Sequence, residues 1–545
     1  NPNMCVGLQQ KPTKEMDSCG GGAHVGLMGN TSAPVVIVGA GMAGLTAANL
    51  LAAEGVAVLL IEKADAPGGK MATITIEGRA IDTGPTVLTL GDVFADLDID
   101  LPQIEPADIL ARHFWSDGAS LDLFADTSRS ADAIAAFAGE EDAKGFHSFT
   151  KAGGAILNAL EDSFMRTDKP ANPIDLMWRG GVRGLSGFAK IDPYRSLWKM
   201  VSQHFADPRL RQLFGRYATY CGSSPFEAPA TLALIAEVER RGVGLVEGGM
   251  GRLAEAMWQG AEHAGAQGRF GMGVEEILVR GGRAAGVRLS DGSTVQAETV
   301  LLTADAAALA EGRFGKAPAK GRTRFKRADR SFSAFTVAML ADAGDAPLVR
   351  HNIAFSDDSE AEFAELAAGR IPSDPTVYLC AQDRGADAAA QRPRGGLEAM
   401  LIVVNAPADG DIHDYSQAEI DQCMTAISNR LSRSGIPIRI DRSRCSISTP
   451  SDFERRFPAT GGALYGRASH GWMASFQRPG ATTGVKGLYC AGGSVHPGAG
   501  VPMAALSGRA ACRAMRKDRA LTSISRRADM PGGMSTRSAT ADATG

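Results

Sequence analysis

Three glycines and a glutamate form the pattern in this chain with the clearest chemical meaning. In the GxGxxG run of residues 39–44, Gly39 permits a tight turn, Gly41 lets the backbone approach a pyrophosphate, and Gly44 lets a helix pack closely on a strand. Glu62 follows Gly39 by 23 residues, a position from which a carboxylate can accept hydrogen bonds from a ribose. This spacing predicts a binding site for a dinucleotide.

The surrounding sequence supplies the elements that would position these residues. Residues 34–63 run through an apolar strand, the glycine turn, an amphipathic helix and a second apolar strand, which together form a βαβ unit. A GxGxxG run alone is a weak signal, because glycine-rich turns also cap ordinary helices. Since strand, helix, second strand and terminal acid all stand in order here, we interpret the unit as a nucleotide site with the phosphates at the helix N-terminus.

Other glycine-rich segments can contribute to the same site. After Glu62 the chain carries Lys70, a cation suited to a phosphate or a ribose, and then two strand-like runs that lead to Gly84. Residues 485–515 read as strand, glycine-rich turn and helix, and the N-terminus of that helix can stabilise negative charge on a bound cofactor. Residues 248–254, GGMGRLA, imitate a second dinucleotide motif, but no buried apolar strand leads into them, so we interpret them as an ordinary helix start.

His496, in the last glycine-rich turn, is the candidate catalytic residue, because an imidazole there could accept a proton or orient a bound ring. The alternative is a histidine that bonds to the backbone of a tight turn, and the same alternative applies to Asp82. No His, Cys and Asp residues have the spacing of a metal site, and neither GxSxG nor a locally supported Ser/His/Asp arrangement occurs. These absences disfavour a hydrolase and a metalloenzyme.

The overall composition bears on several other classes of function. The formal net charge is only -4, with 44% hydrophobic and 22% charged residues, so no global field would attract nucleic acid. The eight cysteines include no CxxC pair, which argues against a disulfide framework or a zinc site and fits a reducing cytoplasm. No apolar run reaches the roughly 18 to 20 residues that cross a bilayer, so any membrane contact would be local.

Several stretches resemble the bacterial carotenoid desaturases, namely DTGPTVLT at 82–89, the run at 216–257 and GLYCAGGSVHPGAGVPMAALSGRAA at 487–511. The resemblance spans nearly the whole folded chain. HNIAFSDD at 351–358 and the run at 457–500 are most similar to the 1-hydroxycarotenoid 3,4-desaturases of purple phototrophic bacteria. Phytoene desaturases are the near alternative. The more distant alternatives are an amine or porphyrinogen oxidase and a flavoprotein that carries carotenoid without desaturating it.

The resemblance implies that the dinucleotide is FAD rather than NAD. It also implies formation of the 3,4 double bond in a 1-hydroxylated acyclic carotenoid such as 1-hydroxyneurosporene. Flavin would supply the hydride acceptor, while the protein supplies position and a dry site. Val274 matches the position where relatives place a backbone contact to the adenine. The terminal electron acceptor and the oligomeric state stay open. The residues expected to bind FAD are Gly39, Gly41, Gly44, Glu62, Lys70, Gly84, Val274, Gly492, Gly493, Val501, Pro502 and Met503.

We expect an α/β flavoprotein in which a Rossmann-type FAD-binding domain is interleaved with a substrate domain of mixed sheet and helices. Both ends of the chain are rich in small or polar residues without an apolar period, which predicts disorder there. The expected segments are a disordered extension (1–32), a first FAD-binding segment (33–115), a helical, membrane-facing insertion (116–245), a second FAD-binding segment (246–310), a substrate-domain sheet (311–454), a third FAD-binding segment (455–517) and a disordered tail (518–545).

Residues 174–200 mix aromatic and basic side chains, among them Trp178, Trp198, Arg179 and Lys199. Such interleaving suits a patch on a membrane surface, through which a carotenoid could enter directly from lipid. The alternative is an ordinary pair of amphipathic helices whose aromatic side chains point inward. The expected location is therefore cytoplasmic, with peripheral association with the inner or photosynthetic membrane.

Overall fold

The computed structural model of this chain describes residues 33–179, 192, 194–320, 326–386, 396–471 and 473–528. The predicted extension at 1–32 and the end of the predicted tail lie outside the described residues. Residues 518–528 are helical, because they form the end of helix α16 (Val501–Ala528). The hydroxyl of Tyr489 donates a hydrogen bond to Asp518 in this helix at 2.5 Å, so the prediction of disorder from residue 518 is wrong at its start.

A parallel five-stranded sheet carries the predicted βαβ unit, in the strand order β19–β13–β1–β2–β9. Strands β1 and β2 are buried along their whole length, because other elements cover both faces of the sheet. This burial explains their uninterrupted apolar sequences VVIV and VLLI. The five strands come from distant regions of the chain: β1 (Val35–Val38), β2 (Val58–Ile61), β9 (Gln267–Arg269), β13 (Thr299–Leu302) and β19 (Leu488–Cys490).

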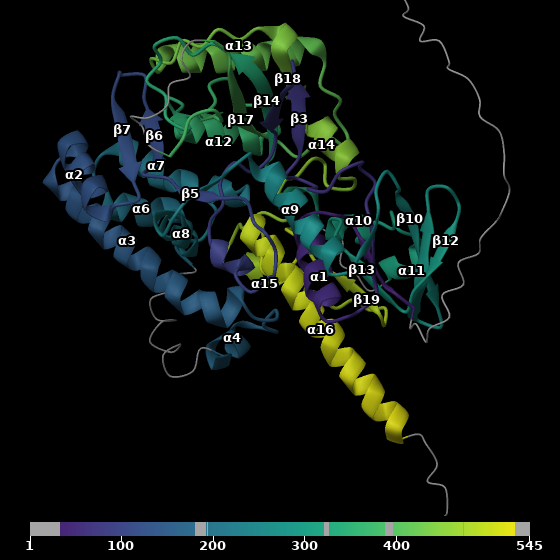
Figure 1. Ribbon diagram of the computed structural model, residues 1–545. Coiled ribbons are helices and arrows are strands. Elements are labelled where there is room, and N and C mark those ends of the chain that lie inside the picture. Colours follow the sequence, from purple (N-terminus) through teal and green to yellow (C-terminus); the bar gives the residue numbers. More distant parts are fainter. Residues whose placement is uncertain are drawn as a thin grey trace, which may run out of the picture. The chain divides into compact units, whose positions relative to one another are not determined.

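Successive residues of β1 serve two separate cores, since side chains of a strand alternate between its faces. Val35 and Ile37 pack with helices α1, α9 and α16, and Figure 1 shows α1 beside the other two. Val36 and Val38 pack on the opposite face against a three-stranded antiparallel sheet. The bounds of these covering elements are α1 (Met42–Ala53), α9 (Met250–His263), β10 (Val274–Arg280), β11 (Arg283–Leu289) and β12 (Thr294–Gln296).

A second, seven-stranded sheet has the order β18–β14–β17–β16–β15–β6–β7. Helix α13 (Gln417–Arg433) covers one face of it, where Met424 and Ile427 meet Phe335 and Ile402 (Figure 1). Strands β6 and β7 come from the first FAD-binding segment and the helical insertion expected from the sequence, so both segments also build this sheet. The strands are β6 (Ile109–Phe114), β7 (Ser120–Phe124), β14 (Ser333–Ala341), β15 (His351–Ala354), β16 (Val377–Ala381), β17 (Glu398–Ala406) and β18 (Cys445–Ser448).

A group of helices between residues 127 and 240 packs against strands β6 and β15 around an aromatic core. The rings of Phe205 and Phe214 stack with centroids 4.5 Å apart, and Phe149 lies against both. The helices are α2 (Thr127–Ala138), α3 (Glu140–Leu160), the π-helix η2 (Glu161–Met165), α4 (Pro173–Arg179), α6 (Leu197–His204), α7 (Pro208–Gly215), the 3-10 helices η3 (Arg216–Cys221) and η4 (Ala230–Ala233), and α8 (Leu234–Arg240).

Short elements connect these layers. Two small antiparallel pairs stand apart from the large sheets: β3 with β4, which are neighbours along the chain, and β5 with β8, which come from distant parts of it. The Rossmann-type βαβ unit and the interleaved mixed sheet and helices confirm the predicted α/β fold class. The remaining elements are β3 (Thr73–Ile76), β4 (Arg79–Asp82), η1 (Gly91–Phe94), β5 (Ile104–Pro106), β8 (Gly244–Val246), α10 (Ala306–Ala310), α11 (Lys316–Ala319), η5 (Arg327–Asp329), α12 (Ser359–Ala367), η6 (Arg442–Arg444), α14 (Pro450–Arg456) and α15 (Ala474–Gln477).

Candidate cofactor and substrate cavity

A cavity of about 900 Å³ brings the glycine-rich segments together with both the seven-stranded sheet and the helices. Its wall includes every residue expected to bind FAD except Gly44, which lies behind the turn. The rest of the wall is mainly apolar. Apolar lining residues outside the glycine-rich segments include Leu110, Leu160, Phe164, Met165, Leu232, Leu234, Ile235, Val238, Val243, Ile353 and Phe355.

The first glycine turn has the geometry that a pyrophosphate requires. Gly39 has φ +106°, in the region that favours glycine, and a Cβ on Gly44 would stand 2.1 Å from the carbonyl oxygen of Gly39. Gly44 is thus needed for helix α1 to pack this closely. A Cβ on Gly41 would meet no protein atom within 4 Å, so this backbone faces open space in the cavity wall. The residues present therefore fit a dinucleotide.

Glu62 is held at the end of β2 by the backbone on both sides of it. Its Oε2 accepts a hydrogen bond from the N–H of Ala40 at 2.7 Å, and its Oε1 accepts one from Ala64 at 2.9 Å. A carboxylate has about four lone-pair positions, so it keeps capacity to accept from a ribose hydroxyl. The buried carboxylate is fixed in place before any ligand arrives.

Lys70 lies in the cavity wall beside a second glycine turn. The N–H of Gly68 donates to the carbonyl of Ala40, which holds this turn against the first one. The Lys70 ammonium donates to the carbonyl of Leu464 and lies 5.2 Å from the ring centroid of Phe457. Burial lowers the pKa of Lys70, although the carboxylate of Asp305 opposes that shift. Two further N–H donors of the ammonium remain for a ligand.

Arg478 is a cavity residue that the sequence analysis missed. Only 4% of it is exposed, and its guanidinium donates to the carbonyls of Tyr465, Gly493 and Arg467 at 3.0, 2.8 and 2.8 Å. It therefore ties the last glycine-rich segment to the preceding loop and places a positive charge beside it. No spacing rule connects an arginine to a glycine 15 residues later, so the sequence carried no signal for this contact.

His496 does not line the cavity, although its neighbours Pro497 and Gly498 do. The imidazole is buried, its Nε2 donates to the carbonyl of Thr167 at 3.2 Å, and its ring lies edge-on to Phe164 with centroids 4.7 Å apart. Burial lowers the pKa of His496 to about 4. This geometry favours the alternative of a histidine that bonds to the backbone over the role of proton acceptor.

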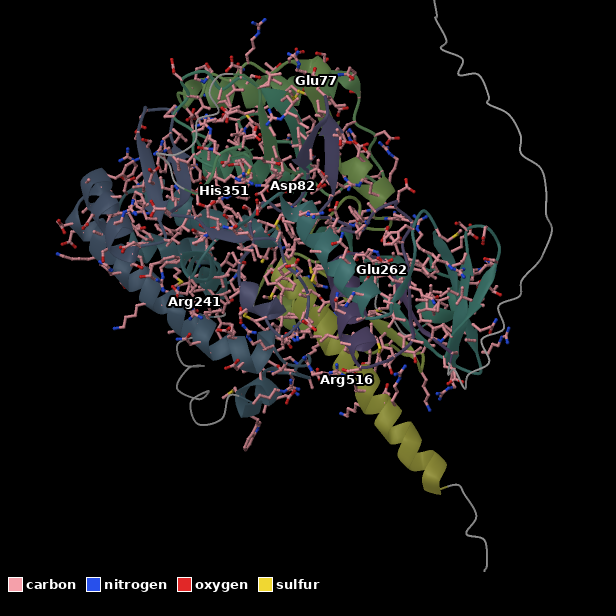
Figure 2. The ribbon with its side chains drawn as sticks, in the orientation of Figure 1. Glu77, Asp82, Arg241, Glu262, His351 and Arg516 are labelled. Atoms are coloured by element: carbon pink, nitrogen blue, oxygen red, sulfur yellow. The ribbon has the colours of Figure 1, made fainter. Side chains whose placement is uncertain are left out.

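Asp82, labelled in Figure 2, also has a structural role. Its carboxylate accepts hydrogen bonds from the backbone N–H groups of Met250 and Gly251, at 2.6 and 3.3 Å, and from the hydroxyl of Thr73 at 2.9 Å. The negative charge therefore caps helix α9, where the helix dipole favours it. This contact fits the interpretation of GGMGRLA as a helix start rather than a second dinucleotide motif.

A second polar group lines the cavity on the substrate side, and the sequence analysis missed it as well. Arg216 and Tyr220 come from η3, Glu239 from α8, and Tyr378 and His351 from the seven-stranded sheet; Figure 2 labels His351 there. Nothing in the sequence brings these residues together, because their positions depend on how separate elements pack. Among the described residues, no group of His, Cys, Asp and Glu could hold a metal ion.

Comparison with known proteins identifies similar chains by sequence and by fold. The model of the flavin containing amine oxidoreductase family matches residues 42–516. The hydroxyneurosporene desaturase of Rubrivivax gelatinosus is 46% identical over 521 residues, which cover 93% of this chain and 97% of that protein. The 1-hydroxycarotenoid 3,4-desaturase of Flavobacterium sp. is 30% identical over 500 residues, covering 87% and 97%. Among solved structures, cyclohexylamine oxidase from Brevibacterium oxydans has a TM-score of 0.52 at 15% identity and covers 90% of this chain and 99% of its own.

Proposed function

Since this chain belongs to the family of flavin-containing amine oxidoreductases and has carotenoid desaturases as relatives, we propose that it forms the 3,4 double bond in 1-hydroxylated acyclic carotenoids such as 1-hydroxyneurosporene. FAD is its cofactor. The observation that carries the proposal is one cavity whose wall joins the dinucleotide-binding turns to a mainly apolar surface. Such a wall suits a hydrocarbon that must lie against the flavin.

The chain's residues would hold the cofactor through the contacts already described. The open backbone at Gly41 and the N-terminus of α1 would receive the pyrophosphate, and Glu62 would bind the ribose. The start of β10 at Val274 would lie at the adenine, and Gly492, Gly493 and the first turn of α16 (Val501, Pro502, Met503) would face the flavin.

The chemistry itself belongs to FAD, which accepts a hydride from a carbon beside the polyene when it is bound. The apolar side chains of the cavity exclude water from that carbon and keep the substrate in line. The fixed positive charge of Arg478 next to Gly493 stabilises negative charge that develops at this end of the cavity.

We further propose that the protein works at a membrane surface on the cytoplasmic side. On helix α4 the side chains of Ile174, Met177 and Trp178 are exposed, Trp178 by 81%, and Tyr194 is exposed by 77%. The basic residues Arg183 and Lys190, which support the predicted patch, lie outside the described residues. No helix of the described residues is long and apolar enough to cross a membrane.

The position of α4 relative to the cavity supports substrate entry from lipid. Helix α4 packs against the π-helix η2, and Phe164 and Met165 of η2 line the cavity. Trp198 differs from Trp178, because it packs against Phe226 with ring centroids 4.7 Å apart and lines the cavity. The exposed patch therefore consists of α4 and Tyr194 and does not include Trp198.

The substrate proposal is tested by incubating the FAD-loaded protein in liposomes with 1-hydroxyneurosporene and, separately, with phytoene. We expect a red-shifted product from the hydroxylated carotenoid alone when the mixtures are separated by chromatography. Conversion of phytoene alone would assign a phytoene desaturase instead. If neither carotenoid is converted although the bound flavin can be reduced, an amine becomes the substrate class to test.

Liposome flotation tests the membrane proposal. Replacing Trp178 with Ser should remove much of the protein from the floating fraction, since burying a large apolar side chain contributes about 1.5 to 3 kcal/mol. Ile412→Ser is the matched control, because Ile412 is exposed by 64% and lies far along the chain from α4. Equal flotation of the wild type and the Trp178 variant would contradict the proposed patch.

A further inference from the structure

Arg216 is a cation in the cavity wall whose hydrogen-bonding capacity is largely unused. A guanidinium has five N–H donors. Among the described residues, the hydrogen bond found for Arg216 joins its Nη1 to the hydroxyl of Tyr220 at a long 3.5 Å, and no carboxylate forms an ion pair with it. A charge with so few partners is costly to hold away from water, so its position needs an explanation.

The three arginines that are fully buried among the described residues, Arg384, Arg430 and Arg478, do not share this feature. Arg430 pairs with Asp357 and Asp374, and Arg384 pairs with Glu398 through two hydrogen bonds. Arg478 donates to three carbonyls. In each case the protein itself satisfies the guanidinium, which is the normal state of a structural arginine. Arg216 instead presents its free donors to the cavity that it lines.

Two aromatic rings hold Arg216 in a fixed direction. Its Cζ lies 5.3 Å from the ring centroid of Tyr220 and 5.8 Å from that of Tyr378. The hydroxyl of Tyr378 is bonded to Thr86 Oγ1 at 2.6 Å and to His351 Nδ1 at 2.8 Å, and His351 Nε2 is buried without a partner among the described residues. The cavity wall thus contains a cluster of oriented polar groups with spare capacity.

The charges in this cluster favour a neutral ligand. Glu239 accepts hydrogen bonds from the hydroxyls of Tyr217 and Tyr220, at 2.9 and 2.8 Å, so Tyr220 links its carboxylate to the guanidinium of Arg216. Burial lowers the pKa of His351 to about 3, which leaves that imidazole neutral. Arg216 and Glu239 carry opposite charges and are linked through Tyr220, so the pair has no net charge that would attract an amine or an anion. A neutral oxygen that can both accept and donate matches the donors and acceptors present.

We propose that Arg216, with Tyr220 and Tyr378, binds the hydroxyl of the substrate and thereby selects hydroxylated over plain carotenoids. This inference rests on the proposed function. In a 1-hydroxylated carotenoid the hydroxyl carbon is only two carbons from the bond that is desaturated, so the hydroxyl site must lie close to the flavin. Thr86, which is hydrogen-bonded to Tyr378, follows Gly84 of the expected FAD-binding segment by two residues, and all three residues line the same cavity. The polyene then extends along the apolar wall.

Binding and turnover of 1-hydroxyneurosporene and of neurosporene, its parent hydrocarbon, test the proposal. Both are measured for FAD-loaded wild type, Arg216→Met and Arg216→Lys, with binding followed by quenching of tryptophan fluorescence. Arg216→Met should weaken binding of the hydroxylated carotenoid about 10- to 100-fold, since a hydrogen bond to a charged group is lost. Binding of neurosporene should change less than about threefold, and Arg216→Lys should recover some of the loss because it keeps a charged donor.

Tyr378→Phe provides a second variant that removes one hydroxyl and no charge, and Arg252→Met, at an exposed arginine on α9, is the matched control. Tyr378→Phe should raise KM for the hydroxylated substrate with FAD content unchanged. The inference would be overturned if Arg216→Met weakened the binding of both carotenoids equally, or if it left the ratio of their affinities unchanged. If the wild type does not convert 1-hydroxyneurosporene, the proposed function fails, while the binding comparison still decides whether Arg216 recognises the hydroxyl.

Discussion

The cofactor side and the substrate side of the cavity are built by different means. On the cofactor side, the backbone makes the site: Gly39 and Gly41 shape the turn, and Gly44 lets α1 approach it. On the substrate side, side chains from separate elements make the site, as with Arg216 and Tyr378. A backbone site needs particular residues at fixed spacing, whereas a side-chain site needs only a particular packing. The two sides should therefore respond differently to substitution.

The largest effect is expected for Gly44→Ala. Its Cβ would stand 2.1 Å from the carbonyl of Gly39, so α1 would have to move off the turn that binds the pyrophosphate. We expect a destabilisation of about 3 kcal/mol together with loss of FAD during purification. Thermal unfolding and the flavin absorbance of the purified protein measure both. A variant that melted like the wild type and kept its flavin would show that the turn is not set by this close packing.

Gly41→Ala separates cofactor binding from folding on the same side. The added methyl group would meet no protein atom within 4 Å, but it would occupy the space proposed for the pyrophosphate. We expect FAD affinity to fall about tenfold, or about 1.4 kcal/mol, while the stability of the FAD-free protein stays within about 0.5 kcal/mol of the wild type. Titration of FAD-free protein followed by flavin fluorescence gives the affinity. If the variant bound FAD as tightly as the wild type, the pyrophosphate would not lie against Gly41.

Acid stability should depend on an ion-pair cluster outside the cavity wall, where Arg430 of helix α13 pairs with Asp357 and Asp374. The Arg430 guanidinium, more than the hydroxyl of Ser116 and the charge of Arg433, lowers the pKa of Asp357 from 3.8 to about 2. A lowered carboxyl pKa gives stability that is present above pH about 3.8 and is lost as the pH falls through about 2. Asp357→Asn lacks this contribution. Its melting temperature should be lower than that of the wild type at pH 6, and the two should converge toward low pH. A constant difference would exclude this linkage.

The smallest effect is expected for His496→Gln. Because this imidazole donates to the carbonyl of Thr167 and lies outside the cavity wall, a glutamine should retain FAD and change kcat by less than about threefold. Product formation from 1-hydroxyneurosporene measures the rate. A loss of 100-fold or more with FAD still bound would restore the role of proton acceptor.

The same contrast explains how far the sequence alone could lead. Gly39, Gly41, Gly44 and Glu62 were predictable because one local βαβ unit determines where they lie. The α/β fold class followed from that unit and from the resemblance to carotenoid desaturases. These features depend on backbone geometry that a short stretch of sequence specifies.

Other features of the cavity were not predictable from local sequence. Arg216 of η3 and Tyr378 of β16 come together only in the folded chain, and no spacing in the sequence encodes that contact. His496 stands in the last glycine-rich turn, but its ring packs edge-on against Phe164 and donates to the carbonyl of Thr167 instead of lining the cavity. Side-chain direction is a tertiary property, so it was the least predictable aspect of the site.

The strand order of the parallel sheet has a consequence for how the protein is made. Strand β19, which pairs with β13 beside β1, begins at Leu488, 453 residues after the start of β1 at Val35. The loop and helix after β19 supply the last wall of the cavity. During synthesis the first βαβ unit can therefore form early, yet no closed pocket exists for FAD until this late segment has left the ribosome. Cofactor capture should be a late, post-translational event, and a ribosome stalled before β19 should carry no tightly bound flavin.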